Sequence, residues 1–304
     1  MQEVEPRSGL LPYLGILRFT GADALAFLQG QVSNDTRILG EGRAMLAAFS
    51  SPQGRVLALL RLMPHAAGLI AILPRELLVP TLEALRRFVL RSKVKIEIAG
   101  PSLEVCGHHG ASLLRSAGIP LPALRDGYVE HDGIGLTVAD VTAGRYFVVG
   151  PPEKLAQYRL AGAHLPADRI EHDWRLADIR AGLPQIYPAT REVFVAQMLN
   201  LDLLDGISFS KGCYTGQEII ARTQHLGRIK RRLYRLQLPE GDWLIGQALL
   251  LSDGRAGRIV EVARAPQGFE ALAVLNLQVD PAADEAVPKT AVAGIPMPLP
   301  YSLS

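Results

Sequence analysis

The run ISFSKGCYTGQEIIAR, residues 207–222, is the most distinctive stretch of this 304-residue chain. It holds Cys213 two residues after Lys211 and between glycines. Thr215 and Glu218 have the Thr-x-x-Glu spacing of a capping box, which predicts a helix that begins directly after the cysteine. A helix N-terminus and a neighbouring lysine lower the pKa of a thiol from about 8.5 to roughly 3.5 to 7.5. The stretch therefore predicts a cysteine that ionises readily.

A structural role for Cys213 is the alternative, because a free cysteine is most often a small buried hydrophobic residue. Its neighbours favour the functional interpretation. Gly212 and Gly216 suit a close approach of the backbone to a ligand, and the adjacent lysine is poor core material. The second cysteine, Cys106, lies in the run LEVCGHHG and has none of these features. We therefore expect Cys106 in the hydrophobic core.

Residues 211–235 also concentrate positive charge, although the whole chain carries a net charge of only +2 at pH 7. The single acid of this stretch is Glu218, and its basic residues are Lys211, Arg222, Arg228, Lys230, Arg231, Arg232 and Arg235. Such a run is either a solvated face or the mouth of a site for a polycarboxylate, a phosphate or RNA. RNA is the least favoured of these ligands, because Tyr214 and Tyr234 are the only rings available for stacking.

The composition is that of a globular protein, with 48% hydrophobic and 20% charged residues. The length suggests two or three domains, with a single large domain as the alternative. The cysteines show no disulfide or zinc spacing. The histidine pairs, such as His108 with His109, lack a third metal ligand and fit solvated loops better. The N-terminus does not resemble a signal peptide, and the most apolar run, residues 56–73, is interrupted by polar residues. We expect a cytoplasmic protein without a membrane segment.

Hydrophobic periodicity predicts strands that interleave with single helices, which is typical of an α+β fold. The expected helices cover residues 21–32, 81–89, 111–117 and 174–181. The expected strands cover residues 14–19, 44–49, 55–62, 69–73, 94–98, 103–106, 136–141 and 145–149. After residue 232 strands dominate, at residues 233–238, 248–251, 258–263 and 271–277, which predicts a small separate β barrel or sandwich.

The run KGCYTGQE, residues 211–218, with the following Ala221-Arg222, resembles the signature of the YgfZ family of folate-binding, tRNA-modifying proteins. The resemblance extends to GADALAFLQGQVSND at residues 21–35, PQGR at residues 52–55, SKV at residues 92–94 and PLPYSL at residues 298–303. It therefore spans nearly the whole chain and is least distinctive between residues 106 and 167.

This resemblance implies the fold of the glycine cleavage T-protein, a tetrahydrofolate-dependent aminomethyltransferase. That fold has two α+β domains and a C-terminal β barrel around a central cavity. By this comparison, residues 1–50 and 165–228 form a discontinuous folate-binding domain that carries the cysteine motif. Residues 51–164 form the second α+β domain, and residues 229–304 form the barrel.

The resemblance further implies a tetrahydrofolate-binding protein that assists the assembly or maintenance of iron-sulfur clusters, including those of radical enzymes that thiolate tRNA. The expected partners are folate and iron-sulfur client or assembly proteins, without stable nucleic-acid binding, and a monomer is expected. The alternative is a folate-dependent one-carbon transferase with Cys213 as nucleophile. Where the T-protein has an Asp-Asp pair, this chain reads Val56-Leu57-Ala58-Leu59. Aminomethyl transfer is therefore not expected.

The candidate site residues follow from the motif and the fold. Cys213 and Lys211 carry the chemistry, and no metal ligands are assigned. Polar side chains in the apolar run VAQMLNLDLL suit the edges of the folate pterin, and the basic residues suit the carboxylates of its glutamate tail. The expected folate contacts are Gln197, Asn200, Asp202, Tyr214, Gln217, Glu218, Arg222 and Arg228, with Lys230 and Arg231 beside them.

Overall fold

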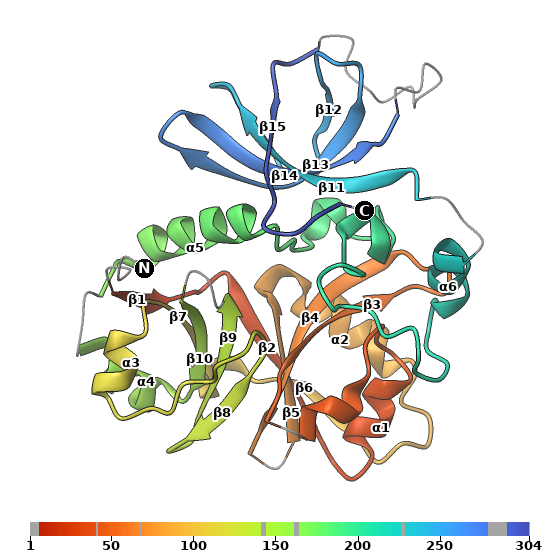
Figure 1. Cartoon of the computed structure of the whole chain (residues 1–304). Helices are drawn as coiled ribbons and strands as arrows, with labels where there is room; N and C mark the ends of the chain where they lie inside the picture. The colour runs from red at the N-terminus through yellow and green to blue at the C-terminus, as the bar shows by residue number, and fades with distance from the viewer. Residues whose placement is uncertain are drawn as a thin grey trace. The chain divides into compact units, whose positions relative to one another are not determined.

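The computed structural model of the chain describes residues 6–40, 42–66, 68–140, 144–160, 164–225, 229–278 and 291–303. The chain forms two compact units (Figure 1). The first unit comprises residues 1–47 and 59–171, and the second comprises residues 48–58 and 172–304. Strands on both sides of residue 50 belong to one sheet. The three-part domain boundaries expected from the sequence stay a prediction.

The first of three five-stranded sheets has the strand order β3-β4-β5-β2-β6. Its strands are β2 (Leu14–Thr20), β3 (Met45–Ser50), β4 (Val56–His65), β5 (Gly68–Pro74) and β6 (Lys95–Ile98). Helix α1 (Ala24–Gln29) packs on β5, and α2 (Leu78–Arg86) packs on β2 and β6. All five strands fall where the hydrophobic pattern predicts them. Helix α2 begins three residues earlier than expected. Pro80 lies in its first turn, where the backbone N–H has no acceptor within the helix, so the proline does not prevent the earlier start.

The second sheet has the order β1-β7-β10-β9-β8. Its strands are β1 (Arg7–Leu10), β7 (Glu104–His109), β8 (Tyr128–His131), β9 (Ile134–Asp140) and β10 (Arg145–Gly150). Helix α4 (Pro152–Leu160) packs on β7 and β10, and a short helix α3 (Ser112–Ser116) precedes β8. Cys106 is 1% exposed and lies in the apolar core of this sheet. The prediction that Cys106 is a core residue is confirmed.

The third sheet, in the second unit, has the order β12-β13-β14-β11-β15. Its strands are β11 (Arg231–Leu238), β12 (Ala248–Leu250), β13 (Ala256–Ala265), β14 (Gly268–Asn276) and β15 (Ile295–Met297). The expected closed barrel is not confirmed, because the described residues leave β12 and β15 as edge strands. Val292 bridges to Leu251 beside β12 before the chain pairs with β11 through β15, so residues 292–297 contact the chain beside one edge strand and supply the other.

Two further helices complete the fold, α5 (Ala167–Ala181) and α6 (Gln217–His225), together with 3-10 turns that include η1 (Thr36–Gly40) and η5 (Ala196–Leu199). No helix among the described residues has the length and apolar character needed to cross a membrane.

His108 is an unusual core residue of the second sheet. It is 1% exposed and pairs in register with Ser8 of β1 and Tyr146 of β10, so the expectation of a solvated loop histidine is wrong for this residue. Neither ring nitrogen has a hydrogen-bond partner among the described residues. Burial, with a smaller effect of His109, lowers the pKa of His108 to about 4. The folded chain therefore holds a neutral imidazole where the unfolded chain would take up a proton.

We expect this histidine to make the protein sensitive to mild acid. The pKa of His108 falls from 6.5 to about 4 on folding, so the unfolded state binds more protons between these values and the free energy of unfolding decreases as the pH falls through this window. The loss approaches about 3 kcal/mol at pH 4. Urea unfolding at several pH values should show a flatter profile for His108→Leu. The same substitution at the exposed His164 serves as control, and an unchanged slope in His108→Leu would contradict the assignment.

Candidate functional site

The cysteine motif forms an irregular segment directly before α6 in the second unit. Cys213 is exposed. Lys211 is only 5% exposed, and its ammonium lies 4.9 Å from the centroid of the Tyr214 ring. Burial raises the pKa of the Tyr214 hydroxyl to about 12. The Cys213 side chain is thus exposed to solvent, whereas the side chains of Lys211 and Tyr214 are buried and contact each other.

Two glycines bring the motif against the turn that contains PQGR. Gly216 has φ +83°, and a Cβ atom there would lie 2.6 Å from the carbonyl oxygen of Ser51. Gly54 has φ +71°, and a Cβ atom there would lie 2.8 Å from the Cβ of Ile219 in α6. Only glycine accommodates both the left-handed backbone and these short distances. Helix α6 begins at Gln217, one residue later than the capping box predicts.

The turn beside the motif is itself firmly held. The Gly54 N–H donates to the Ser51 carbonyl at 2.8 Å, and the Ser51 N–H donates to the Arg55 carbonyl at 2.8 Å. The Arg55 guanidinium donates to the Val193 carbonyl at 2.7 Å, and the Val56 N–H donates to the Phe194 carbonyl at 2.8 Å. Three segments distant in sequence, residues 51–56, 192–195 and 213–219, therefore share one local framework.

Gln197 lies in η5 and is completely buried. Its side-chain nitrogen donates to the Ile220 carbonyl of α6 at 2.7 Å. Its side-chain oxygen is buried and has no hydrogen-bond partner among the described residues. Gln197 thus connects η5 to α6 and keeps one acceptor unused.

Asn200 and Asp202 fasten the same segment to β11. Asn200 has φ +57°, donates to the Leu233 carbonyl at 2.9 Å and accepts from the Leu233 N–H at 3.3 Å. Asp202 accepts two hydrogen bonds from the Arg232 guanidinium, at 2.6 and 2.9 Å. Arg232 also donates to the Gln197 carbonyl at 3.0 Å. Both predicted pterin ligands therefore have structural partners within the chain, and their contact with a folate stays a prediction.

Internal pairing uses much of the basic stretch. Arg232 pairs with Asp202, Arg235 pairs with Glu270, and Arg231 donates to the Asn276 side chain at 2.8 Å. Glu270 also pairs with Arg180 of α5. Burial raises its pKa, but the hydrogen bonds from Arg180 and Arg235 outweigh this effect and hold it below the ordinary value.

The other predicted folate contacts lie on or near α6. Arg222 and Glu218 are exposed on this helix, Gln217 is half-buried, and Lys230 is exposed directly before β11. Arg228 lies outside the described residues. Among the described residues of the stretch, the exposed cations are Arg222, Lys230 and Arg231.

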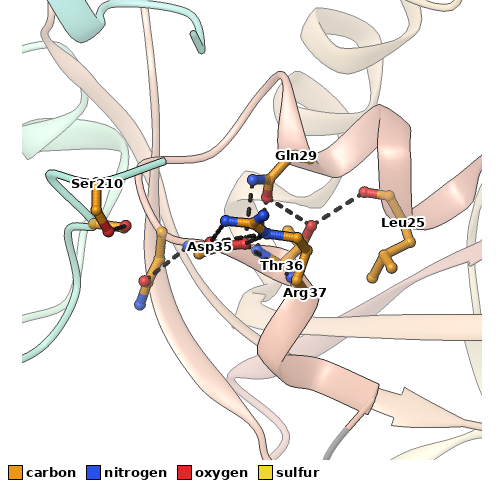
Figure 2. Close-up of polar contacts among 8 residues, drawn as sticks. Leu25, Gln29, Asp35, Thr36, Arg37 and Ser210 are labelled. Atoms are coloured by element: carbon orange, nitrogen blue, oxygen red, sulfur yellow. Dashed lines mark hydrogen bonds and ion pairs between the residues drawn. The ribbon is translucent and has the colours of Figure 1, made fainter. Parts of the chain in front are cut away.

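A second quoted motif, GADALAFLQGQVSND, builds a polar network in the first unit (Figure 2). The side-chain oxygen of Gln29 accepts from the N–H and the hydroxyl of Thr36, both at 2.8 Å. The side-chain nitrogen of Gln29 donates to Asp35 at 3.2 Å, and Arg37 donates to the same carboxylate from Nε at 2.9 Å. The hydrogen bond from Arg37 holds the pKa of Asp35 down at about 2. This network ties the end of α1 to η1.

Sequence analysis missed a buried acid in the third sheet. Glu261 is 2% exposed at a bulge of β13, accepts from the Tyr187 hydroxyl at 2.6 Å and lies 3.4 Å from the Arg175 guanidinium. Burial raises the pKa of Glu261 to about 7 although Arg175 and Tyr187 act in the opposite direction. Its only sequence signal is a glutamate within the apolar run RIVEVA. Among the described residues no three histidine, cysteine or acidic side chains are grouped to hold a metal ion.

The arrangement of strands and helices matches a known fold. The glycine cleavage system aminomethyltransferase T from Bartonella henselae superposes with a TM-score of 0.71 over 90% of this chain and 79% of that one, at 14% sequence identity. The chain is therefore an α+β protein of the T-protein fold class.

Sequence comparison identifies the family within this fold. No family model matches the chain. The tRNA-modifying protein YgfZ of Hamiltonella defensa subsp. Acyrthosiphon pisum (strain 5AT) is 33% identical over 256 residues, which are 83% of this chain and 73% of that protein. The protein of the same name from Pectobacterium carotovorum subsp. carotovorum (strain PC1) is 36% identical over 231 residues, 75% of this chain and 67% of that protein. The chain belongs to the YgfZ family, as the motifs predict.

The glycine contact yields a direct test of the framework. We expect Gly216→Ala to lower the free energy of unfolding by about 1 to 3 kcal/mol or more, because it adds left-handed strain and a clash with a backbone oxygen. Gly212→Ala is the matched control, since a Cβ atom there meets nothing within 4 Å. Urea denaturation of both variants measures the difference. Equal stabilities would show that the turn and the motif do not pack as described.

The buried ion pair yields a second test. Asp202→Ala should cost about 3 to 5 kcal/mol, because it leaves the Arg232 charge buried without its carboxylate partner. The double variant Asp202→Leu/Arg232→Met should be more stable than Asp202→Ala, because it removes both charges together. Asp242→Ala changes an exposed acid of the same unit and should stay within about 0.5 kcal/mol of wild type. Thermal and urea unfolding report these differences, and a mild effect of Asp202→Ala would mean that the pair is not formed in solution.

Proposed function

We propose that this chain is a tetrahydrofolate-binding protein with a role in tRNA modification. In this proposal it assists the assembly or maintenance of iron-sulfur clusters in client enzymes, including radical enzymes that thiolate tRNA. It acts in the cytoplasm as a monomer. The single observation that carries the proposal is the exposed thiol of Cys213 on a framework fixed by two glycines, in a chain of the YgfZ family.

The surroundings of Cys213 favour this role over the one-carbon transferase. A cysteine nucleophile is activated by an adjacent base within hydrogen-bond reach or by a strongly lowered pKa. Among the described residues Cys213 makes no hydrogen bond to a histidine or a carboxylate. The positions of the T-protein Asp pair are occupied by Val56, Leu57, Ala58 and Leu59, which are buried in β4. The absence of the Asp pair therefore favours the assembly role, in which the thiol binds iron, over aminomethyl transfer.

Three features support the folate part of the proposal. The side-chain oxygen of Gln197 is an unused acceptor that suits a donor such as an N–H of a pterin edge, and because Gln197 is completely buried, the segment around it must open to admit the ligand. Asn200 and Asp202 are themselves occupied, so in the proposal they shape the segment that carries Gln197. The exposed Arg222, Lys230 and Arg231 offer charge to the carboxylates of a glutamate tail.

The experiment is complementation of a deletion strain with wild type, Cys213→Ala or Ser210→Ala. Ser210 is exposed three residues before the cysteine and serves as the matched control. We expect Cys213→Ala to reduce the thiolated nucleosides of tRNA to the level of the deletion strain, and Ser210→Ala to restore them. Mass spectrometry of digested tRNA measures both.

Two further results would redirect the proposal. Full complementation by Cys213→Ala would show that the function does not require the thiol. Turnover of methyl or formaldehyde donors by the purified protein, lost in Cys213→Ala, would establish the transferase instead. Calorimetric titration with tetrahydrofolate tests the folate part separately.

A further inference from the structure

A cleft in the first unit lies where the chain crosses between the two sheets of that unit. One crossing leads from β1 to β2, and the other leads from β6 to β7. The crossings run side by side: the Leu11 N–H donates to the Val105 carbonyl and the Ala99 N–H donates to the Ile16 carbonyl, both at 2.9 Å. The start of α2 and the 3-10 turn before it supply a third wall.

The wall of this cleft is largely apolar. Aliphatic side chains come from both crossings and the strands beside them and from α2, and two glycines also line the cleft. A Cβ atom at Gly15 would lie 2.4 Å from the Leu78 side chain, so this glycine lets Leu78 approach the strand closely. The aliphatic residues that line the cleft are Leu10, Leu11, Leu14, Ile16, Leu78, Ile98, Leu103 and Val105.

Two opposite charges line the same cleft and do not neutralise each other. The Arg75 guanidinium is fixed in the wall by donating to the Pro12 carbonyl at 2.7 Å and to the Leu14 carbonyl at 3.4 Å, which leaves its Nη1 group unused. The Glu104 side chain forms no hydrogen bond or ion pair with any described residue, and one of its oxygens is buried. A half-buried carboxylate without a donor is unfavourable unless a ligand or water completes it.

The size of the cleft limits the ligand. Its volume is about 80 Å³. A cavity of about 150 Å³ holds one benzene molecule, so the cleft encloses a group of about three non-hydrogen atoms, and a larger ligand extends out of its open side. The enclosed space fits a small aliphatic side chain and excludes a nucleotide or a folate.

We infer that this cleft binds a small apolar α-amino acid as its zwitterion. The ligand ammonium pairs with Glu104, the ligand carboxylate pairs with the Nη1 group of Arg75, and the aliphatic side chain lies among the leucines. Opposite charges on one ligand match opposite charges on the two walls. Glu104 is half-buried, which strengthens a charge-assisted hydrogen bond to it, whereas Arg75 is exposed and meets the ligand carboxylate at the edge of the cleft. The site lies within the first unit and is separate from the Cys213 region, which belongs to the second.

The test compares L-valine with two analogues that each lack one charge. Isobutylamine lacks the carboxylate, and isovalerate lacks the ammonium. Saturation-transfer NMR titrations of the full chain at millimolar ligand should show valine binding about tenfold or more tighter than either analogue, since each charged hydrogen bond contributes at least that factor. Glu104→Gln should abolish the preference for valine over isovalerate. Arg75→Gln should abolish the preference for valine over isobutylamine.

Control variants and alternative outcomes make the test decisive. Glu83→Gln and Arg87→Gln change exposed charges of the α2 region that do not line the cleft, and both should bind valine as wild type does. Absence of valine binding would refute the proposal and assign the cleft to water. Binding that survives both Glu104→Gln and Arg75→Gln would place the ligand elsewhere. Isobutylamine binding as tightly as valine would show that the site recognises the ammonium alone, which would refute the proposal that it binds the zwitterion.

Discussion

The close approach between the turn at residues 51–55 and Gly216 is the constraint on which the cysteine site depends. The carbonyl oxygen of Ser51 occupies the space that a side chain at position 216 would need, so the turn positions Gly216, the residue directly before α6. Cys213 lies three residues before this contact, and its neighbour Gly212 faces open space. A contact made by backbone atoms has few alternative geometries, which gives the exposed thiol a defined position without burying it. The PQGR turn with Gly54 and the KGCYTGQE run with Gly216 therefore form one structural feature.

The segment that carries Gln197 depends on a second, polar constraint. Asn200 adopts a left-handed conformation and bonds to both backbone groups of Leu233, while Asp202 and Arg232 form a buried pair. A buried ion pair adds little net stability, because the cost of dehydrating two charges offsets most of their attraction. Together with the Asn200 hydrogen bonds, the pair ties the segment to β11 at two points. Gln197 lies in this segment, so its side-chain oxygen, which has no hydrogen-bond partner among the described residues, has a fixed position.

The sequence predicted the strands of the first sheet well, because each has a local apolar pattern with turn residues on both sides. It predicted the core position of Cys106 from the absence of functional neighbours. It did not predict short or polar elements such as β1, β8 and α4, whose stability comes from tertiary packing. The polar residues of VAQMLNLDLL stood out as a binding pattern, yet their partners Leu233 and Arg232 lie about thirty residues away in the chain. No local pattern shows such a pairing.

The same limit applies to the charge of the stretch that follows Cys213. A count along residues 211–235 treats all cations as equivalent, but folding commits Arg232 and Arg235 to internal acids and buries Lys211. Each remaining exposed cation contributes only about 0 to 1 kcal/mol to a surface ion pair. Surface charge alone therefore attracts an anionic ligand without discriminating among ligands. Discrimination requires groups that are dehydrated and fixed in direction. The buried oxygen of Gln197 meets that requirement, and as an acceptor it selects an N–H or O–H donor rather than a negative charge.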